Sequence, residues 1–295
     1  MGSSYVRLTC TVNSGESPRM PIDLSYIGKK LGGVTQSWDQ KDVMLYALGV
    51  GCGREQLPFV YERDLKVLPT FAVVPAFPAM LNLGGAMQVN PAMVLHGEQS
   101  IELTSGNIPV ESTVTTTPTI TAVYDKGKGA VVVVATESKD PSGKVLFRGQ
   151  SSIFVRGEGG FGGDRGPSGA KNAPPDRKPD KSISYTTLPQ QALIYRLSGD
   201  MNPLHADPDF AKMGGFDVPI LHGLCSFGLA GRAVLSAFCN DDPARMKTFE
   251  VRFAGVVFPG ETLTTDMWDV GGGTVVFTSR TERGEALSSA AATLA

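Results

Sequence analysis

Residues 157–181 constrain the fold of this 295-residue chain most, because no packed helix or strand tolerates their composition. These 25 residues hold seven glycines and four prolines. Glycine favours irregular backbone, and proline removes the amide donor that a helix or sheet needs. The stretch is therefore predicted to be a linker between an N-terminal unit, residues 1–156, and a C-terminal unit, residues 182–295.

Short segments on the two sides of this linker match one another in the same order. The pairs are Tyr46–Gly51 with Tyr195–Asp200, Leu68–Phe71 with Leu221–Leu224, His96–Glu98 with Pro259–Glu261, and Tyr124–Gly127 with Trp268–Gly271. Their separation drifts between 144 and 163 residues, as loops of different length would produce. The repeat predicts two copies of one structural unit.

Apolar periodicity predicts that each unit is a helix packed on antiparallel strands, an α+β architecture. One helix is expected to begin at a Ser37 cap and run through Leu48, and a second, apolar on nearly all faces and therefore buried, to end near Cys239. Shorter helices are expected at 189–198 and 207–213. Strands are expected at 59–61, 66–74, 100–103, 110–124, 130–135, 145–155, 182–186, 249–258, 262–270, 274–283 and 286–294.

Residues 71–95 carry no charged side chain, as in a membrane-spanning helix. Their three prolines and a Gly-Gly pair would break such a helix repeatedly, so a membrane span is not expected. We interpret this run as buried lining. Met80 and Met87 are expected to line a pocket for a flexible chain, because methionine adapts to irregular apolar ligands. The alternative is that these methionines only fill an irregular core.

The composition excludes several classes of protein. A net charge of −2 gives no reason to expect nucleic acid or an anionic membrane as partner. Four cysteines (Cys10, Cys52, Cys225 and Cys239) without a CxxC pair, and only three histidines, argue against a metal site and for a reducing, intracellular setting. The N-terminus has no signal-peptide pattern, and the C-terminus is not a Ser-Lys-Leu peroxisomal address.

The segment Gly157–Gly162 fits the GxGxxG pattern of dinucleotide-binding proteins. That fold needs a helix to begin directly after the glycines, so that the N-terminus of the helix faces the pyrophosphate. Four prolines follow within the linker instead, so we do not interpret the pattern as a nucleotide site.

The densest group of reactive side chains is Asp200, Asn202 and His205, which surround an Asn-Pro turn. Because Pro203 holds Asn202 extended, the chain leaves helical geometry there, and a carboxylate and an imidazole can converge on one water as a general acid/base pair. The alternative is a capped helix end with a solvated carboxylate. A Ser198–Asp200–His205 triad is disfavoured because no strained elbow exposes the serine, and Cys225 is expected to be a buried, inert thiol.

Three further positions have both a functional and a structural interpretation. Gly223 lies where the long apolar helix begins, so its free N–H can receive an oxyanion, or the glycine can simply ease helix packing. Lys126, on an expected hairpin turn, can pair with a phosphate or be merely solvated. A lone histidine such as His96 is more often structural.

Three longer motifs carry a family resemblance. Tyr195–His205, Pro219–Phe227 and Val251–Ala254, together with Val94–Gln99 and the linker glycines, resemble the MaoC-like type 2 enoyl-CoA hydratases over nearly everything after about Pro21. The resemblance implies a double hot dog fold and a hydro-lyase that adds water to trans-2-enoyl-CoA, giving (3R)-3-hydroxyacyl-CoA in fatty acid β-oxidation or related acyl metabolism. An acyl-CoA thioesterase and a non-catalytic acyl-CoA binding module remain alternatives.

The resemblance also implies roles for individual residues. Asp200 and His205 would be the catalytic pair, Asn202 would orient the water or the pair, and the N–H of Gly223 would receive the thioester oxygen. The CoA ester would be contacted by His96, Gly97, Lys126 and Phe253. No cofactor beyond the CoA of the substrate is expected, the chain would form a homodimer, and its compartment would be cytoplasmic in a bacterium and peroxisomal in a eukaryote.

Overall fold

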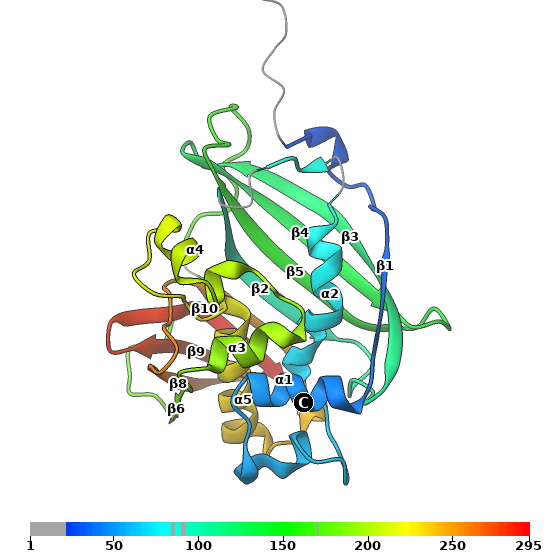
Figure 1. The fold of residues 1–295 in the computed structure, drawn as a ribbon, viewed down its shortest axis with the longest axis vertical. Helices are drawn as coiled ribbons and strands as arrows, with labels where there is room; N and C mark the ends of the chain where they lie inside the picture. The colour runs from blue at the N-terminus through cyan, green and yellow to red at the C-terminus, as the bar shows by residue number, and fades with distance from the viewer. Residues whose placement is uncertain (1–21, 84–85, 90–92, 170) are drawn as a thin grey trace, which may run out of the picture.

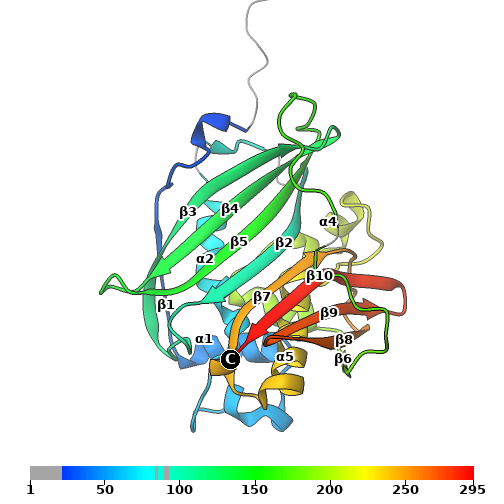
Figure 2. The same cartoon turned by 180° about the vertical axis from the view of Figure 1, so that it is seen from behind.

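The computed structural model describes residues 22–83, 86–89, 93–169 and 171–295. Within these residues, ten strands form one antiparallel sheet in the order β1-β3-β4-β5-β2-β7-β10-β9-β8-β6. Figure 1 shows α1, α2, α3 and α5 on one face of the sheet, and Figure 2 shows the opposite face, which these helices leave uncovered. The α+β architecture is therefore as predicted.

The first five strands and the last five strands form two halves of the sheet. The N-terminal half comprises β1 (Val34–Trp38), α1 (Gln40–Gly49), α2 (Val73–Leu81), β2 (Val94–Leu103), β3 (Ser112–Asp125), β4 (Gly129–Lys139) and β5 (Val145–Arg156). The C-terminal half comprises β6 (Lys181–Thr186), α3 (Gln191–Tyr195), α4 (Pro208–Met213), α5 (Gly223–Cys239), β7 (Met246–Phe253), β8 (Thr262–Gly271), β9 (Thr274–Thr281) and β10 (Gly284–Leu294).

The two halves have the same topology and meet at the antiparallel pair of β2 and β7. Reading outward from that pair, the strand order is β2-β5-β4-β3-β1 on one side and β7-β10-β9-β8-β6 on the other. Each strand thus has a counterpart at the same place in the other half, and α1 and α2 correspond to α3 and α5. The repeat in the sequence is a repeat of structure, although the boundaries 1–156, 157–181 and 182–295 stay a prediction.

Aromatic and aliphatic side chains from the strands bury against the helices. Phe227 on α5 packs edge-on against Phe249 of β7, with ring centroids 4.8 Å apart, and neither ring is exposed. Burying such a ring contributes about 1.5–3 kcal/mol. Helix α1 packs on α3 so closely that a Cβ on Gly49 would lie 3.2 Å from Tyr195 Cα. This contact joins the two halves beneath the sheet.

Three expectations about the first half are wrong. Ser37 belongs to β1, and the cap of α1 is Asp39, whose Oδ1 accepts the amide N–H of Lys41 at 2.8 Å. Residues 59–61 and 66–74 are not strands. They contain 3₁₀ turns and the start of α2, because a short buried apolar run looks the same in a strand and in a buried helix.

The third matched pair of the repeat is also wrong. His96–Glu98 lies inside β2, whereas Pro259–Glu261 lies in the turn between β7 and β8. The turn between β2 and β3 contains Pro109, Val110 and Glu111, and this is the topological counterpart of Pro259–Glu261. A Gly-Glu pair is too short a match to fix the alignment.

The first half has a shortened central helix, as the sequence predicts. Helix α2 spans nine residues with Pro78 inside it, whereas its counterpart α5 spans 17 residues. Part of the uncharged run lies outside the described residues, at 84–85 and 90–92. No helix in the described part of the chain is long and apolar enough to cross a bilayer.

The glycines of the linker bind a carboxylate of the protein itself. Asp125, at the end of β3, accepts the N–H groups of Gly127 (2.8 Å), Gly160 (2.8 Å) and Gly162 (2.7 Å). Gly160 and Gly162 have φ angles of 85° and 76°, which glycine adopts without strain. These hydrogen bonds hold the pKa of Asp125 below its ordinary value. The GxGxxG pattern is thus an internal anion cradle, and β6 rather than a helix follows it.

Candidate active site

The segment after α3 forms two successive tight turns. A 3₁₀ turn at Arg196–Ser198 ends at Gly199, where φ is 123°, and Asp200 follows. The Asp200 carboxylate accepts the backbone N–H of Asn202 at 3.2 Å, and the Asn202 side chain accepts that of Leu204 at 3.0 Å. Both side chains therefore stabilise the loop that carries them, and Asn202 caps the turn Pro203–His205.

His205 is buried at the end of this turn, with 9 % of its surface exposed. Its Nδ1 lies 2.9 Å from the carbonyl oxygen of Ile220, and because a carbonyl only accepts, Nδ1 carries the proton. Burial is the main cause that lowers the pKa of His205, so the ring is neutral near pH 7 and Nε2 has a free lone pair. Ligand atoms of Asp200 and His205 lie within 4.8 Å of each other, so the predicted convergence is present.

Gly223 is the first residue of α5, beside the segment that carries the Asp200–His205 pair (the dyad). The ring of Phe253, at the end of β7, covers it so closely that a Cβ on Gly223 would lie 3.2 Å from Phe253. The ring of His96, on β2, lies 4.8 Å from that of Phe253. The structure thus brings His96, Phe253 and Gly223 together across the junction of the two halves.

The neighbouring Gly97 sits in a bulge of β2, between residues that pair with β5. A Cβ there would lie 3.2 Å from the carbonyl oxygen of Ser152, so glycine permits this close approach. Burial lowers the pKa of His96 to about 4, and its Nε2 is buried without a hydrogen-bond partner among the described residues. Whether His96 and Gly97 contact substrate stays a prediction.

A shallow recess opens beside Asp200. Its lining comes from both halves: Val73, Val74 and Phe77 of α2, together with Tyr195, Ser198, Asp200 and Leu224. The first half therefore supplies an apolar wall opposite the carboxylate. Such a wall suits an acyl chain next to a polar reacting group.

Met80 and Met87 lie further along the first half. Met80 follows Phe77 by about one turn of α2, and both methionines are half-buried against a second core cluster that includes Ile120, Val132 and Ile153. This packing suits a core-filling role as well as a lining role. Their contact with a substrate stays a prediction.

Lys126 has two local partners. It lies on the turn between β3 and β4, where its ammonium donates to the carbonyl oxygen of Arg165 and sits 5.6 Å from the centroid of the Tyr124 ring. The cradle of Asp125 holds this turn against the linker. A role in phosphate binding would require Lys126 to exchange or share these contacts.

The sequence reasoning did not assign a role to His222. This residue precedes Gly223, is 1 % exposed, and stacks on His205 with ring centroids 3.7 Å apart and planes at 30°. Asp200, His205 and His222 offer ligand atoms within 4.8 Å of one another. One nitrogen of each ring is already hydrogen-bonded to a main-chain carbonyl oxygen, that of Ile220 or that of Asp200, so we do not interpret this group as a metal site.

The cysteines of the described residues are all buried. Cys225 is fully buried, its Sγ lies 3.3 Å from the carbonyl oxygen of Gly49, and burial raises the pKa of its thiol, so an inert thiol is confirmed. Cys52 and Cys239 are buried and unpaired, and Cys10 lies outside the described residues. The N-terminal stretch without a signal-peptide pattern also lies outside them.

The first half contains a counterpart of the dyad without its chemistry. In the sequence repeat, Gly51 matches Asp200. Gln56 follows Gly51 by five residues, the same spacing as from Asp200 to His205. Its exposed fraction is 8 %, compared with 9 % for His205. The guanidinium of Arg232 from α5 donates to Gln56 Oε1 at 2.9 and 2.6 Å and to the Val50 carbonyl oxygen at 2.8 Å. A buried arginine of the second half therefore satisfies polar groups of the first half beside Gly51.

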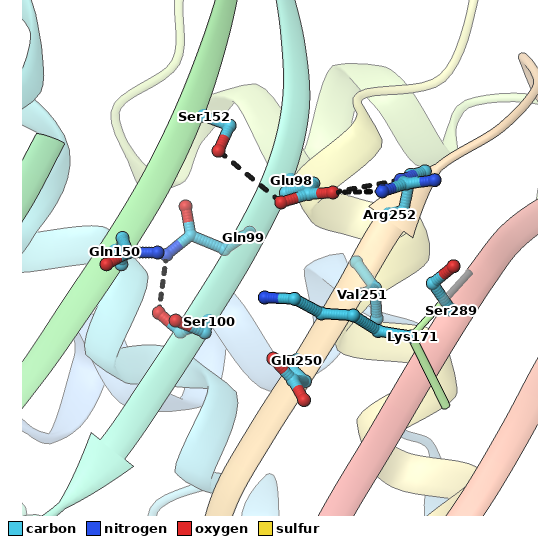
Figure 3. Close-up of a pocket in the computed structure, with 10 residues that line it drawn as sticks. All are labelled: Glu98, Gln99, Ser100, Gln150, Ser152, Lys171, Glu250, Val251, Arg252 and Ser289. Carbon is cyan, nitrogen blue, oxygen red and sulfur yellow. Dashed lines mark hydrogen bonds and ion pairs between the residues drawn. The ribbon is translucent and has the colours of Figure 1, made fainter. Parts of the chain in front are cut away.

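A separate shallow depression lies where β2 meets β7, in front of the sheet with the helices behind it (Figure 3). Glu98 and Arg252 form an ion pair of 2.7 Å there, and Lys171 of the linker borders it. Its lining is polar and carries both signs of charge. The dyad residues do not line it.

Comparison with known proteins identifies the class of this fold and site. Residues 37–157 match the MFE-2 hydratase 2 N-terminal domain, and residues 170–291 match the MaoC like domain. A "MaoC-like dehydratase" from Phytophthora capsici superposes with a TM-score of 0.84 at 35 % identity, covering 93 % of this chain and 98 % of that one. The chain belongs to the MaoC-like dehydratase family, and its fold is the double hot dog.

Relatives within this family carry more specific names. The chain is 44 % identical over 276 residues to the "Probable enoyl-CoA hydratase 2" of Dictyostelium discoideum, which covers 90 % of this chain and 93 % of the relative. It is 42 % identical over 294 residues to the "Peroxisomal hydratase-dehydrogenase-epimerase" of Neurospora crassa. That match spans 96 % of this chain but 32 % of the longer relative.

Proposed function

We propose that this protein is an (R)-specific enoyl-CoA hydratase, which adds water to trans-2-enoyl-CoA to give (3R)-3-hydroxyacyl-CoA and catalyses the reverse dehydration in fatty acid β-oxidation. The observation that carries the proposal is the convergence of Asp200 and His205 beside the first turn of α5, with an apolar wall from the first half. The hydratase names of relatives that match along most of their length support it.

The residues suggest how the reaction proceeds. A water between the Asp200 carboxylate and Nε2 of His205 loses a proton to the pair as its oxygen bonds to C3, and the pair returns a proton to C2. Because one water held between the two groups supplies both the hydroxyl and the proton, both are delivered to the same face and the addition is syn. His205, neutral and protonated on Nδ1, is suited to accept the proton at Nε2.

The negative charge that develops on the thioester oxygen needs a donor. The N–H of Gly223 lies in the first turn of a 17-residue helix, where amides have no acceptor within the helix and the helix dipole favours an anion. Losing one such donor typically costs about 2.7–4 kcal/mol of barrier. Asn202 would orient the water or the dyad through the loop that it caps, and the reaction needs no cofactor beyond the CoA of the substrate.

Steady-state hydration of crotonyl-CoA and longer enoyl-CoA esters, with chiral analysis of the product, tests the proposal. Asp200→Asn and His205→Ala are each expected to lower kcat by at least about 10²-fold while the folded state survives. Asp209→Asn, an exposed carboxylate on α4, is the matched control and should retain wild-type rates. Near-wild-type turnover of either dyad variant would refute the assignment.

Two other outcomes would replace the proposal. Release of free CoA thiol without a hydroxyacyl product would identify an acyl-CoA thioesterase. Saturable binding of acyl-CoA without turnover would identify a binding module. We also propose a homodimer, which light scattering on the purified chain would test, and a peroxisomal location in a eukaryote or a cytoplasmic one in a bacterium.

A further inference from the structure

His222 lies between three groups of the active site. One face of its ring stacks on His205 at 3.7 Å, and the ring of Tyr195 lies 4.9 Å away at an angle of 51°. Its Nε2 lies 3.1 Å from the main-chain oxygen of Asp200. His222 therefore contacts the loop of one dyad residue and the ring of the other.

The hydrogen bonds define the protonation of both rings. Because the main-chain oxygen of Asp200 only accepts, Nε2 of His222 must carry a proton, while in His205 the proton is on Nδ1. Burial, followed by the neighbouring His205, lowers the pKa of His222 to about 3, so its ring is neutral. The two stacked imidazoles thus hold opposite tautomers.

The charged and titratable groups around His222 are few. Asp200 approaches through its main-chain oxygen, and its carboxylate also lies within 4.8 Å of a His222 ring nitrogen. The neutral His205 ring and Arg196 both disfavour a positive charge on His222, and the phenol of Tyr195 is kept protonated by burial. Nδ1 of His222 is buried without a hydrogen-bond partner in the described part of the chain. An uncharged ring is the form that such surroundings accept.

A single short segment carries all of these contacts. The Ile220 oxygen fixes the tautomer of His205, the His222 ring holds the Asp200 main chain, and Gly223 begins α5. The N–H of Leu221 donates to the Val257 oxygen at 2.7 Å and anchors the segment to the loop after β7. The three functional groups therefore share one support.

We propose that His222 is a positioning residue, which holds the Asp200 loop with its Nε2–H and keeps the His205 ring in place by stacking. The inference rests on the proposed hydration reaction. It assigns His222 no contact with substrate. Its contribution is to hold Asp200 and His205 in fixed positions relative to each other, because a displacement of about 1 Å can cost about 10²-fold in rate.

Imidazole nitrogen NMR tests the geometry without any assay of activity. The chain has only three histidines, so substitution of His96 by Gln assigns one set of signals and leaves two. At pH 7 we expect His205 protonated on Nδ1 and His222 on Nε2, both neutral. A His222 ring protonated on Nδ1 alone would overturn the proposal, whether or not the protein hydrates enoyl-CoA.

Kinetics of three variants separate the two contacts. His222→Ala removes both and should lower kcat about 10²-fold, with KM changed less than about threefold because substrate is not touched. His222→Phe keeps the stacked ring without the donor and should lower kcat about tenfold, because the hydrogen bond to the Asp200 main chain is lost while the stacking contact remains. His222→Gln restores a donor and should recover part of the loss.

The pH profile distinguishes positioning from a loss of folded protein. In His222→Ala, water reaches the His205 ring, which raises its pKa, so the acidic limb of kcat/KM should move to higher pH; in His222→Phe it should not move. Equal losses in all three variants with an unmoved limb, or wild-type kcat in His222→Ala, would overturn the proposal. A wild-type protein without hydratase activity would refute the proposed function instead, while the NMR result would still test the geometry.

Discussion

Replacing Arg232 by Met should destabilise the protein strongly, because its buried guanidinium is the hydrogen-bond donor to acceptors of the first half. Arg232 is 5 % exposed, makes three hydrogen bonds of 2.6–2.9 Å to Gln56 and Val50, and lies 4.0 Å from the centroid of the Tyr185 ring. Methionine nearly matches its length but offers no donor. Two buried acceptors, the Gln56 amide oxygen and the Val50 carbonyl, would lose their partners.

The magnitude follows from these contacts. An unsatisfied buried acceptor costs about 1–3 kcal/mol, and a desolvated cation–π contact contributes about 2 kcal/mol. Removing the charge also removes its own desolvation cost, which offsets part of the loss. We expect the free energy of unfolding of Arg232→Met to fall by about 2–4 kcal/mol, which for a chain of this length corresponds to a melting temperature lower by about 3–7 °C.

Chemical unfolding followed by circular dichroism measures this loss, and a double-mutant cycle locates it. Gln56→Met combined with Arg232→Met makes both partners apolar, so the double variant should regain about 1–3 kcal/mol over the sum of the single losses. Arg280→Met is the control, because its ion pair with Asp266 is 56 % exposed on the arginine side and should contribute less than about 1 kcal/mol. An Arg232→Met variant no less stable than this control, or strict additivity in the cycle, would refute the reasoning.

Four further predictions concern other parts of the molecule. Burial lowers the pKa of His96 to about 4, so between about pH 6.5 and 4 the unfolded chain binds a proton at this residue that the folded chain does not. The free energy of unfolding should therefore fall by up to about 1.4 kcal/mol per pH unit from this group as pH drops from 6.5 to 4. Melts between pH 7 and 4 should show a less steep fall in His96→Gln. Met80→Trp or Met87→Trp should lower hydration of long-chain esters more than of crotonyl-CoA, and equal losses at all chain lengths would count against a lining role. Lys126→Met should raise KM for CoA esters but not for N-acetylcysteamine thioesters, since only CoA carries phosphates; a parallel rise would exclude phosphate pairing. Asp125→Asn places an amide where the carboxylate accepts three glycine N–H groups and should lower the melting temperature, whereas an unchanged melt would contradict the cradle.

The dyad was predictable because its geometry is local. Asp200 and His205 are five residues apart across a turn that Pro203 dictates, so the sequence alone limits where the two side chains can point. The buried helix α5 was predictable for a similar reason, since a 17-residue apolar run has few other solutions. Both features depend on neighbours in the chain.

Features that depend on distant partners were missed or mistaken. Asp125 binds Gly160 and Gly162 from 35 and 37 residues away, so the glycine pattern could be rejected as a nucleotide site but its partner could not be named. His222 is 22 residues from Asp200, and no sequence period links them. The Ile-Leu-His-Gly motif directly before a buried helix was the one available indication, because a histidine there must be buried and partnered.

The pairing of β2 with β7 has a consequence for how this enzyme could diverge. In a symmetric dimer of identical units, each substitution appears in both active sites at once, so neither site can be lost without the other. Once a single chain contains both units, selection can act on each separately: Asp200 is present in one unit, while the other has Gly51 at the matching position of the repeat. A mutation in the first unit can then reshape the apolar side of the recess beside Asp200 without changing Asp200 or His205.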